Sequence, residues 1–195
     1  MSRQVEFFFD YVSPFSYLAD SQLAGLAERT GATIRYRPFL LGGVMQATGN
    51  SPPMAVPAKG KYTAVDIPRW VAHYGVELNP NPHFPVNTLA AMRGAIASVE
   101  DGCFSVYHDA LFRAVWVDGV DVADPDALRG VLEKAGLDAV AILERCADPA
   151  VKDALKASTA DAVERGAFGA PTFFVGNEMF FGNDRLHFVE QALRS

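Results

Sequence analysis

Hydrophobic and polar positions between residues 5 and 39 predict a strand, a helix and a second strand. Val5 to Phe9 is a short apolar and aromatic run, which favours a buried strand over a helix. After Ser13-Pro14, one helical stripe ends at Gly31 and carries Tyr17, Leu18, Leu23, Leu26 and Ala27. Thr33 to Phe39 alternates apolar and polar residues, and a right-handed crossover would place this second strand parallel to the first.

The middle of the chain changes from a loop pattern to a helical one. Leu41 to Lys61 is rich in glycine and proline and has little periodicity, which predicts a long binding loop. Thr63 to about Arg165 has helical periodicity, and the Asp-Pro pairs at Asp124 and Asp148 are typical helix starts. Five or six successive helices cannot extend a sheet, so we expect a helical insertion packed on one side of it.

Strand signals return near the end. Thr172 to Val175 and Glu178 to Phe181 flank the turn dipeptide Gly176-Asn177, which predicts a β-hairpin, and a final helix should run from about Asp184 to Leu193. The order βαβ, helical block, ββα is that of an α/β, thioredoxin-like fold. We therefore expect a thioredoxin-like domain at 1–62 and 167–195, with an inserted all-helical domain at 63–166.

Composition and charge exclude several classes of protein. Half of the 195 residues are hydrophobic, which supports a sizeable core, and the formal net charge of −6 argues against nucleic-acid binding. No apolar run approaches the ~20 residues of a membrane span, and Glu6 and Asp10 bracket the first apolar run where a secretory leader would be basic. We expect a cytoplasmic protein without membrane or nucleic-acid partners.

Cysteine and histidine spacing argues against a metal site. Cys103 and Cys146 are far apart, which favours two buried free thiols over a redox pair. The histidines form no ligand pair at helical spacing, so each is expected on the surface or in satisfied packing: His73, His83, His108 and His187.

The segment Ser13-Pro14-Phe15-Ser16 joins the first strand to the first helix. A thioredoxin-like fold carries its C-x-x-C pair here, because the helix N-terminus stabilises a thiolate. Both cysteine positions are serine, which excludes disulfide exchange but leaves a helix end that favours an anion. The simpler interpretation is that Ser13 caps the helix and Pro14 occupies its first turn.

Two later segments could complete a site. Gly169-Ala170-Pro171-Thr172 stands where this fold would place a cis-proline facing the first helix, although Pro171 could simply begin a strand. In Phe181-Gly182-Asn183-Asp184-Arg185, Asp184 could hold an ammonium group and Asn183 a carboxylate, as an amino-acid head group requires. The alternative is that either residue caps the last helix.

Five segments, in order along nearly the whole chain, resemble 2-hydroxychromene-2-carboxylate isomerases and, less closely, kappa-class glutathione transferases. They are Phe9-Asp10-Tyr11-Val12-Ser13-Pro14-Phe15-Ser16-Tyr17-Leu18-Ala19, Gly49-Asn50-Ser51-Pro52-Pro53, Val56-Pro57-Ala58-Lys59-Gly60-Lys61-Tyr62, His83-Phe84-Pro85-Val86-Asn87-Thr88 and Phe181-Gly182-Asn183-Asp184-Arg185. The resemblance implies a DsbA-like thioredoxin fold, a homodimer, glutathione as cofactor and a small aromatic carboxylate as substrate.

The resemblance also implies roles for single residues. Ser13 would contact the glutathione sulfur, and the backbone of Ala170, before Pro171, would pair with the cysteinyl part. The γ-glutamyl end would lie on Asn183 and Asp184, while Asn50 and Lys59 would reach the rest of the peptide.

The substrate pocket is less well defined by the sequence. Relatives often carry lysine where this chain has Gln46, so the substrate carboxylate would be held differently here. They also often carry a larger aliphatic residue where this chain has Ala170, so the pocket beside the sulfur could be wider. Asn87 is a candidate polar contact. Candidates for an aromatic-accepting wall are Pro53, Tyr62, Phe84, Trp116 and Phe181.

The activity implied by the resemblance is isomerisation of 2-hydroxychromene-2-carboxylate to trans-o-hydroxybenzylidenepyruvate, a step of aromatic hydrocarbon degradation. Glutathione thiolate would add to the conjugated carbon, the ring would open, a single bond would rotate, and elimination would return the glutathione. One alternative is a transferase or peroxidase, in which the sulfur ends in the product or in a disulfide. The other is a non-catalytic thioredoxin-fold module that binds extended peptides against the Pro171 loop.

Overall fold

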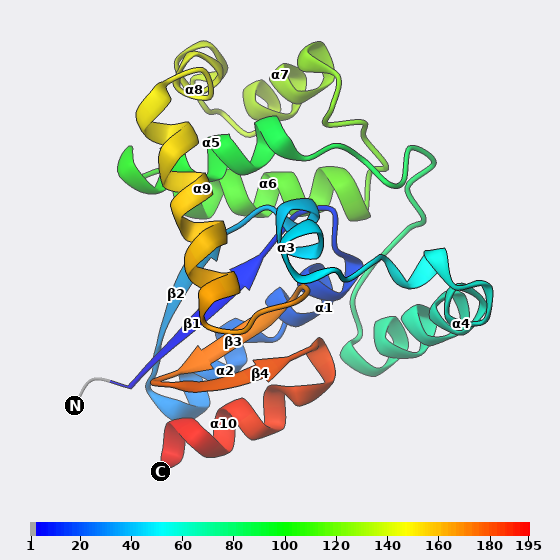
Figure 1. Ribbon diagram of the computed structural model, residues 1–195. Coiled ribbons are helices and arrows are strands. Elements are labelled where there is room, and N and C mark those ends of the chain that lie inside the picture. The colour runs from blue at the N-terminus through cyan, green and yellow to red at the C-terminus, as the bar shows by residue number, and fades with distance from the viewer. Residues whose placement is uncertain (1–2) are drawn as a thin grey trace.

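A computed structural model describes residues 3–195 and has a four-stranded sheet of order β2-β1-β3-β4 at its centre (Figure 1). Strand β1 (Gln4–Phe9) pairs in parallel with β2 (Thr33–Pro38) and antiparallel with β3 (Thr172–Val175). The hairpin partner of β3 is β4 (Glu178–Phe181). The predicted strands, the parallel first pair and the C-terminal hairpin are all confirmed.

Both faces of the sheet are covered, which explains why β1 is apolar without alternation. Phe7 and Phe9 point into one core, shared with helices α2 (Leu23–Thr30), α6 (Phe104–Trp116) and α10 (Leu186–Arg194). Phe8 points into a second core, formed with helices α3 (Leu41–Thr48) and α9 (Pro149–Glu164). On the first side, Phe7 stacks on Phe173 with 5.1 Å between ring centroids. A strand buried on both faces reads as a continuous hydrophobic run, as observed here.

The helices follow the predicted order. Those of the first part are α1 (Pro14–Asp20), α2 (Leu23–Thr30), α3 (Leu41–Thr48) and α4 (Pro57–Tyr74). The predicted helical block, residues 63–166, holds most of α4 and all of α5 (Leu89–Glu100), α6 (Phe104–Trp116), α7 (Pro125–Lys134), α8 (Ala139–Arg145) and α9 (Pro149–Glu164). As expected, the side chains of Asp124 and Asp148 cap α7 and α9. The last helix, α10 (Leu186–Arg194), begins slightly later than predicted, after a 3-10 turn η2 (Asn183–Arg185).

The prediction of one continuous first helix was wrong. The chain breaks between α1 and α2 at Ser21 and Gln22. The Ser21 hydroxyl donates to the Leu18 carbonyl at 2.7 Å, and so satisfies a carbonyl that the break leaves free. The break lets each half bury its own apolar residues, Leu18 in α1 and Leu23 in α2.

The prediction of a long loop over Leu41 to Lys61 was also wrong. The segment contains α3, a 3-10 turn η1 (Pro53–Ala55) and the beginning of α4, which runs across residue 62. Helix α3 forms despite its two glycines because it packs on α9: a Cβ on Gly43 would stand 3.4 Å from the Thr159 methyl group. Packing against distant elements, more than local propensity, stabilises short helices.

The thiols are free, with Cys146 buried and Cys103 only partly buried, so the prediction of two buried thiols is confirmed for Cys146 alone. His108 is a satisfied packing residue, since its ring contacts Tyr11 Oη at 3.2 Å and Asp20 Oδ1 at 2.9 Å. Within residues 3–195, no helix is both long and apolar enough to cross a membrane.

Candidate functional site

Ser13 and Pro171 meet at the carboxyl end of β1. Ser13 caps α1, and its Oγ accepts a hydrogen bond from the Ser16 N–H at 3.1 Å. The same hydroxyl donates to the carbonyl of Ala170 at 3.3 Å, and the Ala170-Pro171 peptide bond is cis. The expectation that a cis-proline faces the start of the first helix is therefore confirmed. Ser13 has the capping role of the simpler interpretation as well.

A buried carboxyl, Asp10, fixes the segments around Ser13. It accepts hydrogen bonds from the Leu41 N–H at 2.8 Å, from the Val12 N–H at 3.1 Å and from the Thr88 hydroxyl at 2.6 Å. These donors belong to the start of α3, the turn before α1 and the start of α5. Burial raises the pKa of Asp10 above its ordinary value, and the three hydrogen bonds offset only part of that rise.

This raised pKa predicts a pH dependence of folding. Between the ordinary pKa of 3.8 and the raised folded value, the folded protein holds a proton that the unfolded chain has lost. The stability from Asp10 is therefore full below about pH 3.8 and falls as the pH rises through the folded pKa. We expect urea unfolding to show this fall in the wild type and its absence in Asp10→Asn. Parallel pH profiles for the two proteins would contradict the prediction.

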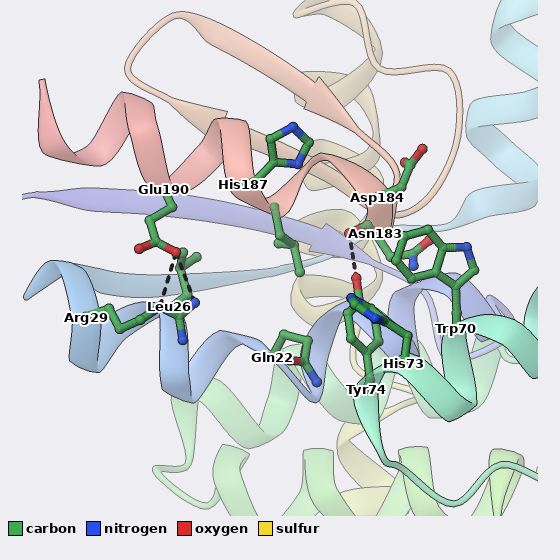
Figure 2. Close-up of a pocket in the computed structure, with 11 residues that line it drawn as sticks. Gln22, Leu26, Arg29, Trp70, His73, Tyr74, Asn183, Asp184, His187 and Glu190 are labelled. Carbon is green, nitrogen blue, oxygen red and sulfur yellow. Dashed lines mark hydrogen bonds and ion pairs between the residues drawn. The ribbon is translucent and has the colours of Figure 1, made fainter.

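A cavity of about 260 Å³ lies where η2 meets α4, α2 and α10 (Figure 2). Its lining includes Asn183 and Asp184 on η2, and Tyr74 at the end of α4, whose hydroxyl donates to the Asn183 carbonyl at 2.9 Å. The 3-10 turn also contacts α1, which begins at Ser13. Ser13, near the start of the chain, and Asn183 and Asp184, near its end, therefore lie on neighbouring elements.

The Asn183 side chain is buried, and its Nδ2 has no hydrogen-bond partner among the described residues. A buried amide without an acceptor is costly, so the cavity suits a ligand with a carboxylate or carbonyl oxygen. Neither Asn183 nor Asp184 caps α10, whose N-cap residue is Arg185. The capping alternative for these two residues is therefore wrong.

Asp184 is partly exposed and paired with the Arg185 guanidinium. Its position depends on Gly182, which adopts φ +99°, a left-handed conformation, and where a Cβ would stand 2.5 Å from Asp184 Oδ1. Burial raises the pKa of Tyr74, so this phenol keeps its proton and donates to Asn183. At the far end of the cavity, a hydrogen bond from Arg29 lowers the pKa of Glu190 (Figure 2).

Asn50 and Lys59 do not lie beside the cavity that Asn183 lines. Asn50 lies just after α3, and its Nδ2 donates to the Phe168 carbonyl at 2.7 Å, which ties α3 to the loop before Pro171. Lys59 is exposed in the first turn of α4. Ser13, Asn50 and Lys59 lie outside the lining of the 260 Å³ cavity.

The candidate substrate residues are spread over several elements. Gln46 is exposed on α3, Pro53 on η1 and Tyr62 on α4, where the Tyr62 hydroxyl donates to Asp66 at 3.1 Å. Asn87 uses its Oδ1 to accept from the Leu89 N–H at 3.1 Å. Among the described residues, no hydrogen bond or ion pair joins any of these four to Ser13.

Three of the four aromatic candidates lie in ring pairs: Phe84 with Trp116, and Phe181 with a further phenylalanine. The rings of Phe84 and Trp116 lie 5.8 Å apart, and Trp116 donates from its indole N–H to the Tyr11 carbonyl at 2.8 Å. Phe181 pairs with Phe168, a residue that sequence reasoning missed, at 4.5 Å. Phe168 is also the residue whose carbonyl holds Asn50.

Sequence reasoning also missed the wall that α4 contributes to the cavity, made by Trp70, His73 and Tyr74. The aromatic pair Trp70 and Tyr74 at i and i+4 was a visible signal, since such spacing places both side chains on one face of a helix. The helical block was expected to pack only on the sheet, so no contact between α4 and η2 was foreseen.

Four features define a class: the mixed sheet, the serine-capped α1, the cis-proline before β3 and the inserted helices. Together they describe a DsbA-like thioredoxin fold in which both positions of the redox pair are serine. The chain belongs to the DSBA-like thioredoxin domain family, which it matches over residues 4–194. Relatives that align over nearly its full length include 2-hydroxychromene-2-carboxylate isomerases and kappa-class glutathione transferases.

The identities with these relatives extend over almost the whole chain. It is 38% identical to a 2-hydroxychromene-2-carboxylate isomerase of Sphingobium xenophagum, covering 99% of both chains. It is 30% identical to glutathione S-transferase kappa 1 of Homo sapiens, covering 99% of this chain and 92% of that one. A solved structure of 2-hydroxychromene-2-carboxylate isomerase superimposes with a TM-score of 0.87 at 36% identity, covering 97% of this chain and 94% of that one.

Proposed function

We propose that the protein is a glutathione-dependent isomerase that converts 2-hydroxychromene-2-carboxylate to trans-o-hydroxybenzylidenepyruvate, acting as a homodimer in the cytoplasm. The observation that carries the proposal is the 38% identity, over nearly the full length, to three enzymes named for this substrate. The serine pair at the start of α1 supports it, because this site has no thiol of its own for disulfide exchange.

The cavity at η2 fits the γ-glutamyl end of glutathione. That end carries an ammonium and a carboxylate. Asp184 would hold the ammonium, and the unpaired Nδ2 of Asn183 would donate to the carboxylate. Tyr74 would keep the Asn183 backbone in place through its 2.9 Å hydrogen bond. Lys59 would offer a mobile cation for the glycyl carboxylate.

Ser13 would act on the sulfur. When bound, glutathione supplies a thiolate that can add to a conjugated carbon and leave again. The Ser13 hydroxyl, which now makes a long 3.3 Å bond to Ala170, would turn its proton toward the sulfur. A free thiol has a pKa of about 8.5, and one hydrogen bond to a charged group contributes roughly 1.5–3 kcal/mol. This shifts the thiol pKa by about one to two units, toward neutrality.

Beside the sulfur, the backbone of Ala170, whose carbonyl accepts a hydrogen bond from Ser13 at the start of α1, would pair with the cysteinyl peptide group. The substrate carboxylate is the least supported contact. Gln46, which stands where relatives often carry lysine, would offer an amide donor without charge.

A kappa-class transferase or peroxidase is the second candidate function, favoured by the 30% identity to the human enzyme. The test is absorbance of a synthetic 2-hydroxychromene-2-carboxylate, mixed with the protein with and without glutathione. Conversion that requires glutathione supports the isomerase. A glutathione conjugate formed with another electrophile, without isomerisation, would favour the transferase, and no glutathione binding would favour the peptide-binding module.

Asp184→Asn should weaken glutathione binding about tenfold, because the ammonium group loses a charged acceptor but keeps a neutral one. Isothermal titration of glutathione measures the dissociation constant. Asp126→Asn, an exposed aspartate on α7, is the matched control and should bind like the wild type. Equal affinity in Asp184→Asn would remove Asp184 from the binding site.

A further inference from the structure

A second and larger cavity, of about 650 Å³, lies between α3, α5 and α9. Most of its wall is apolar or small, formed by Leu40 and Ala47 on the α3 side, Leu89 on α5, and Leu155 and Val163 on α9. Ser13, Asn183 and Asp184 lie outside its lining. Its size is that of a small-molecule site, which typically measures about 300–1,000 Å³.

The lining of this cavity carries more positive than negative side chains. Arg93, Lys152 and Lys156 contribute three cations, and Glu164 is the acidic residue of the lining. Glu164 follows Lys156 by eight positions along α9, which places their backbones about 12 Å apart at 1.5 Å per residue. The Lys156 ammonium bonds Asp153 at 3.0 Å on the exposed surface, so it is already partly neutralised.

Neither Lys152 nor Arg93 makes an ion pair among the described residues, and of the two only Arg93 has a buried nitrogen without a hydrogen-bond acceptor. Arg93 stands one turn after Leu89 on α5 and is half-buried, and the nitrogen in question is its Nε. Its guanidinium lies close enough to the buried Cys146 thiol to offset part of the rise that burial causes in that pKa. A guanidinium against an apolar wall is costly unless an anion and an acceptor are supplied.

We propose that this cavity is a binding site for an amphipathic monocarboxylate, with the carboxylate on Arg93 and an apolar body against Leu89, Leu155 and Ala47. The planar fork of arginine matches a carboxylate, and the apolar wall gains from covering a hydrophobic body. Because the lining holds three cationic side chains and one acidic side chain, charge complementarity favours a carboxylate over a second copy of this chain, whose net charge per chain is −6 but which offers no single anion of matching size. The site is separate from the one proposed for glutathione.

The test is calorimetric titration of octanoate, an amphipathic monocarboxylate without an aromatic ring, into the full chain at saturating glutathione. We expect one molecule per chain and at least about tenfold weaker binding to Arg93→Met, because a hydrogen-bonded charge pair is lost. Ala160→Trp fills the cavity wall and should abolish binding. Arg129→Met, an exposed arginine on α7, is the matched control and should bind like the wild type.

Two measurements keep the test decisive should Arg93→Met fail to fold. The neutral octanamide should bind the wild type at least about tenfold more weakly than octanoate. Ultracentrifugation of Ala160→Trp should show an unchanged sedimentation coefficient. Octanoate binding that is unaffected by both substitutions, equal binding of the amide, or dissociation of Ala160→Trp oligomers would each overturn the proposal. None of these outcomes bears on the Ser13 site, whose test is glutathione-dependent turnover.

Discussion

Replacing Ser13 by alanine is expected to lower turnover about 10- to 100-fold while glutathione remains bound. The lost hydrogen bond to the thiolate is worth roughly 1.5–3 kcal/mol, and each 1.36 kcal/mol corresponds to a factor of ten. The bound thiol should titrate about one to two pH units higher, as followed by the ultraviolet absorbance of the thiolate. Raising the pH should therefore restore part of the lost rate.

The fold should survive this substitution. Ser13→Ala removes the helix cap to the Ser16 N–H, at a cost of about 0.5–2 kcal/mol in the free energy of unfolding. Ser16→Ala is the matched control, since the Ser16 Oγ is buried and has no hydrogen-bond partner among the described residues. Wild-type turnover in Ser13→Ala, with glutathione bound, would remove the Ser13 hydroxyl from the mechanism.

Glu6→Ala is expected to destabilise the protein by about 2–3 kcal/mol, because it removes charged hydrogen bonds, worth about 1.5–3 kcal/mol, from a partly buried charge network. The Glu6 carboxylate, only 16% exposed, pairs with Arg37 and, at 2.8 Å, with Arg165. Asp161 bridges the same two arginines. The Arg165 guanidinium also lies 3.8 Å from the centroid of the Phe174 ring, so the network closes the α9 side of the sheet.

Urea unfolding measures this loss. Glu178→Ala, an exposed glutamate on β4, is the matched control and should change the free energy of unfolding by no more than about 0.5 kcal/mol. A loss below about 1 kcal/mol in Glu6→Ala would mean that Asp161 alone compensates both arginines. Asp161 is 40% exposed, so water already weakens its share of the network.

The strands and the hairpin could be predicted because their signals are local. Phe7, Phe8 and Phe9 form an apolar run that only a strand covered on both faces explains, and Gly176-Asn177 provides the turn. Helix α3 could not be predicted, because its stability depends on contacts distant in sequence. The Asp10 carboxylate accepts its first N–H across 31 residues, and Thr159 packs on it from α9.

The candidate site, too, could be predicted only in part. Ser13 and Pro171 are marked by local motifs at element ends, and the structure joins them through the Ala170 carbonyl. The cavity beside Asn183 depends on Tyr74, 109 residues away in sequence, and no local pattern reports that contact. The unpaired amide of Asn183 is likewise a property of the packed chain, which the sequence alone does not show.

The central claim is that glutathione is a cofactor that returns unchanged, and one experiment tests it directly. The protein is mixed with 2-hydroxychromene-2-carboxylate in large excess over glutathione, and both the product and the free thiol are measured at the end. The account predicts complete conversion to the isomer with the thiol count unchanged. Conversion that stops when one equivalent of glutathione has been used, or that proceeds without glutathione, would contradict it.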